Sequence, residues 1–514
     1  LNDNAQDVHP PLYYVGLFLW RLGWGHSDTA IRLYSTVWSM IGLVAIYLLA
    51  REIGGRQAGV IALIFGAVNP LHAYFAQEAR MYAQAAAATT FASWCLWRWM
   101  IAAARSPGPG GWWRWAVAYG VCAWLSIMTH YITVTVLVAQ GLFALGWFRL
   151  RRRWAALAGY MVCSVAVALA FLPWLLYVLR VRETFYHPAL EWMGYPPATD
   201  YVSFLGLEFL QGRLAPHTGR PPVEETILPV FLLGVCAWRA IGIPPDAESH
   251  TGKLSRAGIG YLFWLLAVPV VLVAYLVYAY GPIYFRPSYP IFVLAPFLAL
   301  AAIGSLSLRR VERWAVAVVL SLIMLSATWF QLERENKIDW RRFAEVYHEV
   351  GPPDHIVFFP DFAGGAAVHA LGHPVPLVPR AQLEAQRQQF EGSEIWVCWA
   401  HALSITIDHD YFEWLLSLGT VENVYVPAGP GVWSVTVGRH VPESLTGRVD
   451  RWFEPCNIPG ILFELDHRGG FSVPEFHDTD QGPFRWSFEE ARLVLRDHGE
   501  ATTLVLNVNL PPPV

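Results

Sequence analysis

Long apolar stretches separated by short polar connections fill the first 330 residues of the chain. A transmembrane helix needs about 20 consecutive apolar residues, and ten stretches approach or reach that length. They cover residues 30–50, 57–75, 81–104, 112–129, 131–149, 155–179, 226–241, 258–280, 288–307 and 313–330. The stretch 226–241 is the shortest of them. This pattern predicts a mainly α, polytopic transmembrane domain over residues 1–330.

Every second connection between these stretches is basic. The residues concerned are Arg51 and Arg56; Arg105 and Arg114; Arg149, Arg151, Arg152 and Arg153; Arg239, Lys253 and Arg256; and Arg309, Arg310 and Arg313. Cytoplasmic loops of membrane proteins carry such an excess of positive charge. We therefore predict that these connections face the cytoplasm. The opening residues, the loop 181–225 and the tail from residue 331 then lie on the extracytoplasmic side.

Composition changes near residue 331. The whole chain is 55% hydrophobic with a mean hydropathy of +0.35. Residues 331–514 nevertheless hold 26 of the 40 acidic residues and only 13 of the 36 basic ones. Helix patterns at "WRRFAEVYHEVG" and "YFEWLLSLG" and strand patterns at "HIVFFP", "EIWVCWA", "VENVYVP" and "GVWSVTV" predict an extracytoplasmic α/β domain at 331–440. Residues 441–514 are richer in turns, with strand patterns at "ARLVLRD" and "TTLVLNVNL". They predict a β-rich segment, an incomplete β-sandwich that either binds carbohydrate or is a structural appendage.

The stretch 12–24, "LYYVGLFLWRLGW", is apolar but too short to cross a bilayer. Its aromatic residues predict a helix that lies in the membrane interface. Pro10 and Pro11 suit the start of that helix and would hold Asp7 and His9 at the membrane surface. The alternative interpretation of these residues is a plain junction between a loop and a helix.

Three further extracytoplasmic turns carry polar side chains. "QEARMY" places Glu78, Arg80 and Tyr82 in one turn, "MTHYIT" places His130 in a second, and "YFRPSYP" places Arg286 at the start of an apolar stretch. Each turn also has a purely structural interpretation. Glu78 and Arg80 would lie in a solvated turn, His130 would be hydrogen-bonded within the fold, and Arg286 would extend to the membrane interface. Ionisable groups beside membrane spans are costly and usually functional.

Together these side chains predict one site. Arginine pairs with phosphate oxygens, and a carboxylate can take a proton from a hydroxyl group. We predict Asp7 and Glu78 as catalytic residues. The predicted substrate-binding residues are His9, Arg80, Tyr82, His130 and Arg286.

The motifs "DVHPPLYY" and "QEARMYA" resemble those of membrane glycosyltransferases with the GT-C fold. The similarity is to the family-39 group, which includes protein O-mannosyltransferases and aminoarabinose transferases. This resemblance implies transfer of a sugar from a polyprenyl-phosphate carrier to a glycan, lipid or protein acceptor outside the cytoplasmic membrane. It implies that Asp7 and His9 line the donor region, that Glu78 and Arg80 match the second acidic motif, and that Arg286 lies near the phosphate.

The family usually carries an Asp-Glu pair upstream of its "HPPL" motif, and this chain starts too late to contain it. We expect truncation at both ends, and a catalytic pair upstream of residue 1. The sequence requires no cofactor, has no cysteine spacing typical of a metal site, and leaves a divalent metal open.

Two other functions compete with this one. A transporter or flippase with a sensing ectodomain would carry ionisable residues in mid-span, whereas these spans are nearly free of charge. Arg98, the nearest exception, can extend toward the cytoplasmic interface. A glycan ligase or polymerase of similar architecture would differ in its acceptor. Nucleic-acid binding is not expected, because no basic cluster accompanies exposed aromatic residues on a soluble domain.

Overall fold

The computed structural model describes most of the predicted transmembrane domain (residues 1–330) and parts of the tail from residue 331. The described residues are 9–106, 108–181, 209–210, 230–232, 234–235, 238, 256–280, 289–333, 340–359, 364–399, 418–424, 431–437, 449–451, 462–466 and 493–496. The chain divides into two compact units, residues 1–334 and 335–514. Each unit is described by itself.

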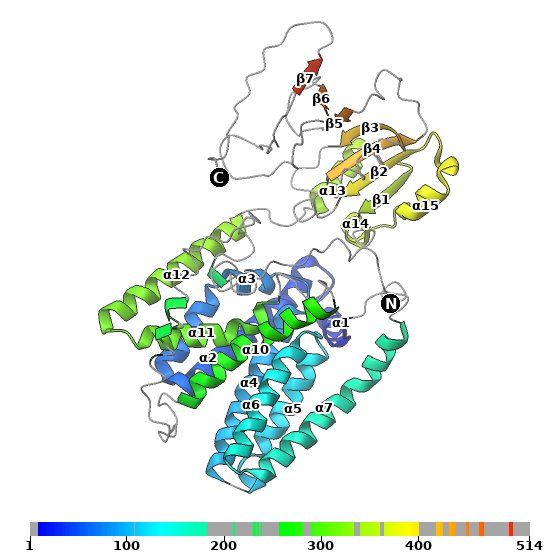
Figure 1. The fold of residues 1–514 in the computed structure, drawn as a ribbon. Helices are drawn as coiled ribbons and strands as arrows, with labels where there is room; N and C mark the ends of the chain where they lie inside the picture. The colour runs from blue at the N-terminus through cyan, green and yellow to red at the C-terminus, as the bar shows by residue number, and fades with distance from the viewer. Residues whose placement is uncertain are drawn as a thin grey trace. The chain divides into compact units, whose positions relative to one another are not determined.

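The first unit is helical (Figure 1). Its helices are α1 (Leu12–Trp24), α2 (Asp28–Ala67), α3 (Pro70–Ala76), α4 (Tyr82–Arg105), α5 (Trp113–Ile127), α6 (Thr133–Leu150), α7 (Trp154–Val181), α10 (Arg256–Tyr280), α11 (Ile291–Leu306) and α12 (Arg310–Glu333). Among the described residues, α2, α6, α7, α10 and α12 are long and apolar enough to cross a membrane. The mainly α, multi-pass architecture predicted from the apolar pattern is confirmed. The predicted stretch 226–241 lies mostly outside the described residues.

Helix α2 is a hairpin of two antiparallel halves. It breaks at Gly55, whose φ of 86° and ψ of 176° are not helical. Residues eight positions apart in a straight helix are separated by about 12 Å along the axis, yet Gly59 lies directly against Arg51 and Tyr47. Gly66 likewise lies against Leu43. The two predicted spans 30–50 and 57–75 therefore exist as separate legs joined by a tight turn.

The second leg ends earlier than predicted. Asn69 interrupts it and caps the start of α3. The Asn69 side chain accepts a hydrogen bond from the backbone N–H of His72, in the first turn of α3. Thr328 of α12 donates to the carbonyl oxygen of Val68 at 2.8 Å. The break at residues 68–69 is thus stabilised by side chains that satisfy its backbone groups.

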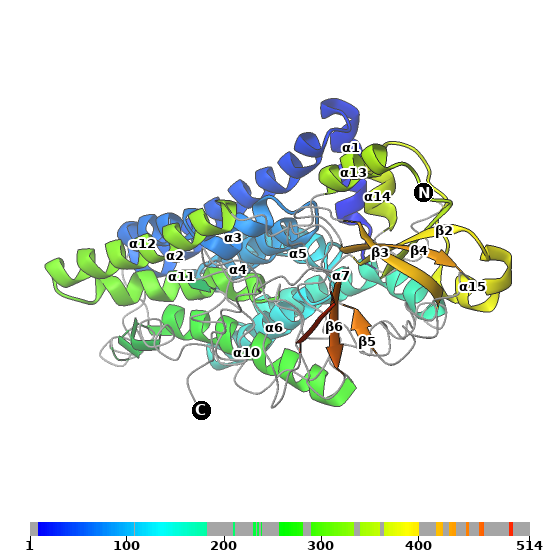
Figure 2. The same cartoon turned by 90° about the horizontal axis from the view of Figure 1, so that it is seen from above.

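Helices α4 and α11 form the centre of this unit. Helix α4 packs against α2, α5 and α6, and α11 packs against α2, α4 and α10. Every residue of α11 except Leu306 is buried, as expected of a helix that is apolar on all sides and surrounded by others. Figure 2 shows α4 and α11 among the surrounding helices from above. Helix α1 packs on α2, where Trp20 donates to the carbonyl oxygen of Ala30 at 2.9 Å.

The second unit contains an α/β fold. Its elements are α13 (Trp340–Val350), β1 (His355–Phe359), α14 (Gly364–Leu371), α15 (Arg380–Ala385), β2 (Glu394–Trp399), β3 (Gly419–Val424) and β4 (Gly431–Val437). The strand order is β1-β2-β4-β3, with β1 and β2 parallel and the other pairs antiparallel. Phe343 of α13 packs with Phe358 and Trp396 of the sheet. The helix and strands predicted near 340–359 and 394–399 are confirmed.

A second sheet follows in the chain. Strands β5 (Val449–Arg451), β6 (Leu462–Asp466) and β7 (Leu493–Arg496) form an antiparallel sheet in that order. The strand predicted at "ARLVLRD" coincides with β7. The predicted helix "YFEWLLSLG" and strand "TTLVLNVNL" lie almost entirely outside the described residues. The β-sandwich stays a prediction.

Candidate active site

The short turn between α5 and α6 carries His130, which is only 3% exposed. His130 Nδ1 accepts a hydrogen bond from the backbone N–H of Ile132 at 3.2 Å. A neutral histidine has one protonated ring nitrogen, so its proton is on Nε2. That Nε2 is buried and has no hydrogen-bond partner within the described residues. Burial, and then the charge of His9, lowers the pKa of His130 to about 3.

Aromatic rings surround His130 on several sides. The centroid of its ring lies 5.7 Å from that of His9, 5.4 Å from that of Tyr82 and 5.5 Å from that of Tyr289. Phe292 of α11 lies 5.4 Å away. These residues precede α1, begin α4, precede α11 and lie within α11. The structure therefore brings together three predicted site residues, His9, Tyr82 and His130.

A backbone hydrogen bond fixes the opening stretch against this turn. The N–H of Leu12, the first residue of α1, donates to the carbonyl oxygen of Met128 at 3.2 Å. Pro11 directly precedes the helix, as its fixed φ and missing N–H favour. The prolines thus precede α1, as predicted, and His9 lies at the turn that carries His130.

Glu78 and Arg80 form an ion pair in the turn between α3 and α4. Arg80 Nε lies 3.6 Å from Glu78 Oε1, and the two side chains are 57% and 18% exposed. Partial desolvation opposes the charge of Arg80, but attraction by Glu78 and then by Tyr82 outweighs it and raises the pKa of Arg80. The influence of Tyr82 on Arg80 connects this pair to the rings around His130. The turn therefore presents a cation beside a carboxylate, as predicted.

Tyr13 of α1 lies beside the same turn. It packs on Tyr34 with ring centroids 5.5 Å apart, and its hydroxyl lies 3.4 Å from Ser35 Oγ. Burial chiefly raises the pKa of Tyr13 to about 12, and the negative charge of Glu78 adds to that effect. The phenol stays protonated and can donate a hydrogen bond at any physiological pH.

Gln84 of α4 connects Tyr34 of α2 to Thr129 of the α5–α6 turn by hydrogen bonds. The Tyr34 hydroxyl donates to Gln84 Oε1 at 2.8 Å, and Gln84 Nε2 donates to Thr129 Oγ1 at 3.0 Å. All three side chains are buried. Sequence reasoning missed Tyr13, Tyr34 and Gln84. The available signal was the presence of a glutamine inside an apolar span, because a polar group there needs partners.

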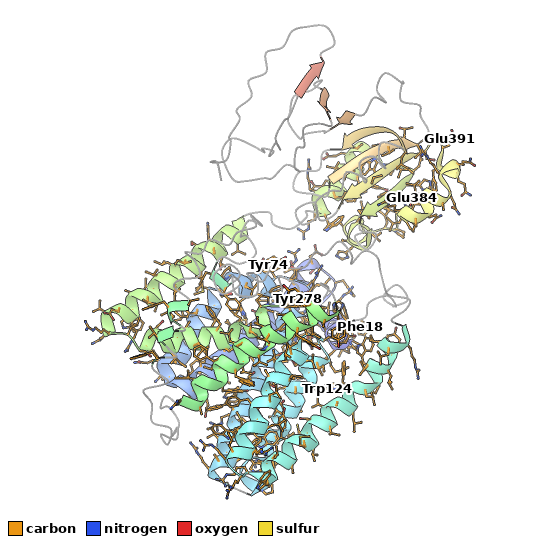
Figure 3. All side chains as sticks on the ribbon, in the orientation of Figure 1. Phe18, Tyr74, Trp124, Tyr278, Glu384 and Glu391 are labelled. Carbon is orange, nitrogen blue, oxygen red and sulfur yellow. The ribbon has the colours of Figure 1, made fainter. Side chains whose placement is uncertain are left out.

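A small pocket of about 20 Å³, room for about one water molecule, lies between α2, α3, α4 and α11. Its lining is mainly apolar: Ser39, Gly42, Ile46, His72, Phe75, Ala83, Ala86, Ala87, Thr90, Ile291, Leu294 and Ala295. Ser39 Oγ and His72 Nε2 lie 2.6 Å apart. Phe75 joins the pocket to the site, since its ring lies 4.7 Å from that of Tyr82. Figure 3 marks α3 by Tyr74 and α1 by Phe18.

Two predicted site residues cannot be placed. Asp7 and Arg286 lie outside the described residues. Of the seven predicted, the structure therefore locates His9, Glu78, Arg80, Tyr82 and His130. Within the part of the chain that the structure describes, no three His, Cys, Asp or Glu side chains are placed to hold a metal ion.

Comparison with known proteins identifies the architecture. The chain is similar to the solved structure of ArnT from Cupriavidus metallidurans bound to undecaprenyl phosphate, at 14% identity and a TM-score of 0.52, covering 83% of this chain and 87% of that one. The chain has the GT-C glycosyltransferase fold. A family profile described as dolichyl-phosphate-mannose-protein mannosyltransferase matches residues 8–177 of this GT-C chain, which include α1 to α6 and most of α7.

Two other GT-C structures show weaker similarity. Archaeal oligosaccharyltransferase AglB from Archaeoglobus fulgidus has 12% identity and a TM-score of 0.41, covering 85% of this chain and 67% of that one. Arabinofuranosyltransferase AftD from Mycobacteria has 14% identity and a TM-score of 0.41, covering 80% of this chain and 34% of that one. A search of curated protein sequences found no match.

Proposed function

We propose that this GT-C chain transfers a sugar from a polyprenyl-phosphate carrier to an acceptor hydroxyl at the extracytoplasmic face of the cytoplasmic membrane. The observation that carries the proposal is the Glu78–Arg80 ion pair, which precedes Tyr82 in the chain, together with the packing of the Tyr82 ring on the buried ring of His130. An arginine, a carboxylate and a neutral hydrogen-bond donor are the side-chain groups that a phosphate-linked sugar and an acceptor hydroxyl require. The matched family and ArnT, whose structure was solved with undecaprenyl phosphate, are consistent with this donor class.

Arg80 is the group in the described part of the site suited to the donor phosphate. Its side chain is more than half exposed, so a phosphate can reach it without breaking the fold. Charge-assisted hydrogen bonds to phosphate are among the strongest that side chains make.

Glu78 is the candidate base. In the reaction, the acceptor hydroxyl oxygen attacks the anomeric carbon while the bond from that carbon to the phosphate oxygen breaks. The hydroxyl proton passes to a carboxylate, and polyprenyl phosphate leaves with the bonding electrons. Glu78 lies next to the candidate phosphate-binding cation, which is the position that this proton transfer requires. Asp7 stays a second candidate for the same role.

His130 is suited to donate a hydrogen bond rather than to act as a base. Its low pKa keeps it neutral, and its Nε2–H is buried beside the rings of Tyr82 and His9. A neutral donor can bind a sugar hydroxyl or a phosphate oxygen without changing the charge of the site. Tyr82 can stack on the sugar ring, as aromatic side chains commonly do with apolar faces.

The test is sugar transfer by the purified protein in lipid discs. The substrates are a panel of polyprenyl-phosphate pentoses and hexoses, and the readouts are released polyprenyl phosphate and donor affinity. We expect Glu78→Gln to lower turnover about 10²–10⁴-fold with unchanged donor affinity. Arg80→Gln should weaken donor binding roughly ten- to a hundredfold, and Arg80→Lys should weaken it less.

The matched control is the exposed pair of Arg380 and Glu384 in the second unit, 2.8 Å apart. Glu384→Gln and Arg380→Gln should leave turnover and donor binding unchanged. Wild-type donor binding and turnover in both Glu78→Gln and Arg80→Gln would contradict the proposed site.

A further inference from the structure

The α4–α5 and α6–α7 connections meet at the end of the helical unit opposite the candidate active site (Figure 1). Tyr82 begins α4 at the site, and Arg105 ends it at this far end. Arg153 donates to the carbonyl oxygen of Ala104, which ties the two connections together. Trp112 stacks on Trp99 with ring centroids 5.4 Å apart.

This end is strongly positive. It carries Arg105, Arg114, Arg149, Arg151, Arg152 and Arg153, and the chain has no acidic residue between Glu78 and Glu183. Helices α4, α5, α6 and α7 therefore offer no carboxylate to balance these charges. Arg105, Arg114, Arg149 and Arg152 are exposed.

Helix electrostatics explains only part of this charge. Arg105 and Arg149 lie in the last turns of α4 and α6, where the helix dipole favours a cation. Arg114 instead lies in the first turn of α5, and Arg153 directly precedes α7. A cation is unfavourable at these positive helix ends. The excess of positive charge in cytoplasmic loops accounts for the sign of these charges, and an external anion would stabilise the cations on the α5 and α7 side.

Buried donors without a hydrogen-bond partner also occur at this end, as they do elsewhere in the described helical unit. Trp112 Nε1 and Arg153 Nε are buried and have no hydrogen-bond partner among the described residues. Trp112 as a whole is 6% exposed. Buried donors are costly when unpaired. An oxygen-rich ligand without donors of its own would complement them.

Apolar side chains surround the charges. Leu150, Trp154 and Trp113 are 85%, 59% and 50% exposed. The Arg151 guanidinium lies over the Trp147 ring at 4.1 Å from its centroid. Exposed tryptophans beside arginines are typical of the level at which lipid head groups meet acyl chains. The anion is therefore expected to carry an apolar attachment.

We propose that this end binds the head group of an anionic phospholipid such as phosphatidylglycerol. The phosphodiester oxygens accept hydrogen bonds from the arginines of the α6–α7 turn, and the acyl chains lie along the exposed apolar residues. Basic clusters between transmembrane helices bind anionic head groups in this way. The proposal is independent of the sugar-transfer reaction.

The experiment is native mass spectrometry of the detergent-purified full chain, titrated with phosphatidylglycerol or phosphatidylcholine. The test variant is Arg149→Gln/Arg151→Gln/Arg152→Gln. Arg153 is kept because it holds Ala104. The charge-preserving variant carries lysine at the same three positions. The control is Arg309→Gln/Arg310→Gln, at a basic turn where Glu312 accepts from the Arg309 N–H at 3.1 Å.

The wild-type chain should retain phosphatidylglycerol in preference to phosphatidylcholine. Each arginine near an anionic surface contributes about fivefold in affinity, so the triple glutamine variant should lose roughly a hundredfold. The lysine variant and the control should stay within a few-fold of wild type. Should the triple glutamine variant not fold, the single variant Arg152→Gln should still lose about fivefold. Equal retention of both lipids by the wild type, or an equal loss in the control, would overturn the proposal.

Discussion

The imidazole rings of His9 and His130 lie edge to face, with their centroids 5.7 Å apart. His9 precedes α1, whereas His130 lies in the α5–α6 turn. Two positively charged rings at this distance would repel each other in a buried setting. The pKa of about 3 for His130, caused by burial and then by His9, keeps that ring neutral.

This arrangement predicts a pH dependence of stability. The pKa of His130 is near 6.5 in the unfolded chain and about 3 in the folded one. Between these values the unfolded chain binds a proton that the folded chain does not. The free energy of unfolding should therefore fall as pH drops from 6.5 toward 3, by at most about 1.4 kcal/mol per pH unit. Thermal unfolding in detergent at pH 7 and pH 4.5 measures it.

The variant His130→Gln should flatten this part of the profile. It removes the titrating group while retaining a side chain that can donate a hydrogen bond. An unchanged difference between the two pH values in the variant would show that another group is responsible.

Gln84→Leu should destabilise the helical unit and disturb the site. The substitution leaves the buried Tyr34 hydroxyl and Thr129 Oγ1 without their partner. Leaving the Tyr34 hydroxyl unpaired costs about 1–3 kcal/mol, and the lost bond to Thr129 Oγ1, which still donates to the Leu125 carbonyl oxygen at 2.6 Å, adds about 1 kcal/mol. Tyr34→Phe removes only one of the two bonds and should cost about 1 kcal/mol. Denaturant unfolding of both variants measures this. Equal losses would mean that the bond to Thr129 contributes nothing.

Breaking the Glu52–Arg98 pair should cost less than breaking a fully buried pair. Arg98 Nη1 donates to both carboxylate oxygens of Glu52, at 3.0 and 3.1 Å, and also lies over the Trp115 ring. Arg98 was expected to extend to the interface, and the structure pairs it instead. Because its side chain is 32% exposed, we expect Glu52→Gln to cost about 1–2 kcal/mol, below the 3–5 of a buried pair. The double variant Glu52→Gln/Arg98→Met should recover part of the loss in a thermal unfolding assay.

Gly55→Ala should strain the α2 hairpin. With φ at 86° and ψ at 176°, Gly55 occupies a region that is essentially restricted to glycine. The expected cost is about 1–3 kcal/mol in unfolding free energy. Gly108→Ala is the control, because Gly108 has a negative φ and open space around it. Similar stability of the two variants would argue against the hairpin geometry.

Cysteine labelling tests the proposed orientation. A membrane-impermeant thiol reagent applied to intact cells should label Glu391→Cys, which is exposed in the second unit, and should not label Arg152→Cys. Figure 3 marks Glu391. Labelling of Arg152→Cys without that of Glu391→Cys would invert the orientation and place the site on the cytoplasmic side.

The sequence by itself determined the helices and most of their limits. Apolar runs must be helical in a bilayer, because only helices satisfy all their backbone groups within one segment. The predicted stretches 81–104 and 258–280 accordingly match α4 and α10 within two residues. Motif spacing also placed Glu78, Arg80 and Tyr82 in one turn, since residues so close in the chain cannot separate.

Tertiary structure alone decided which turns meet. No local pattern could show that His9 and His130 would touch or that Gln84 would join Tyr34 to Thr129, because those contacts depend on how helices pack in space. The sequence did not identify Glu52 as the partner of Arg98 for the same reason, because Glu52 lies on a different helix. Hydrophobicity determines that a segment is buried, but only side-chain packing determines which neighbouring segments it contacts.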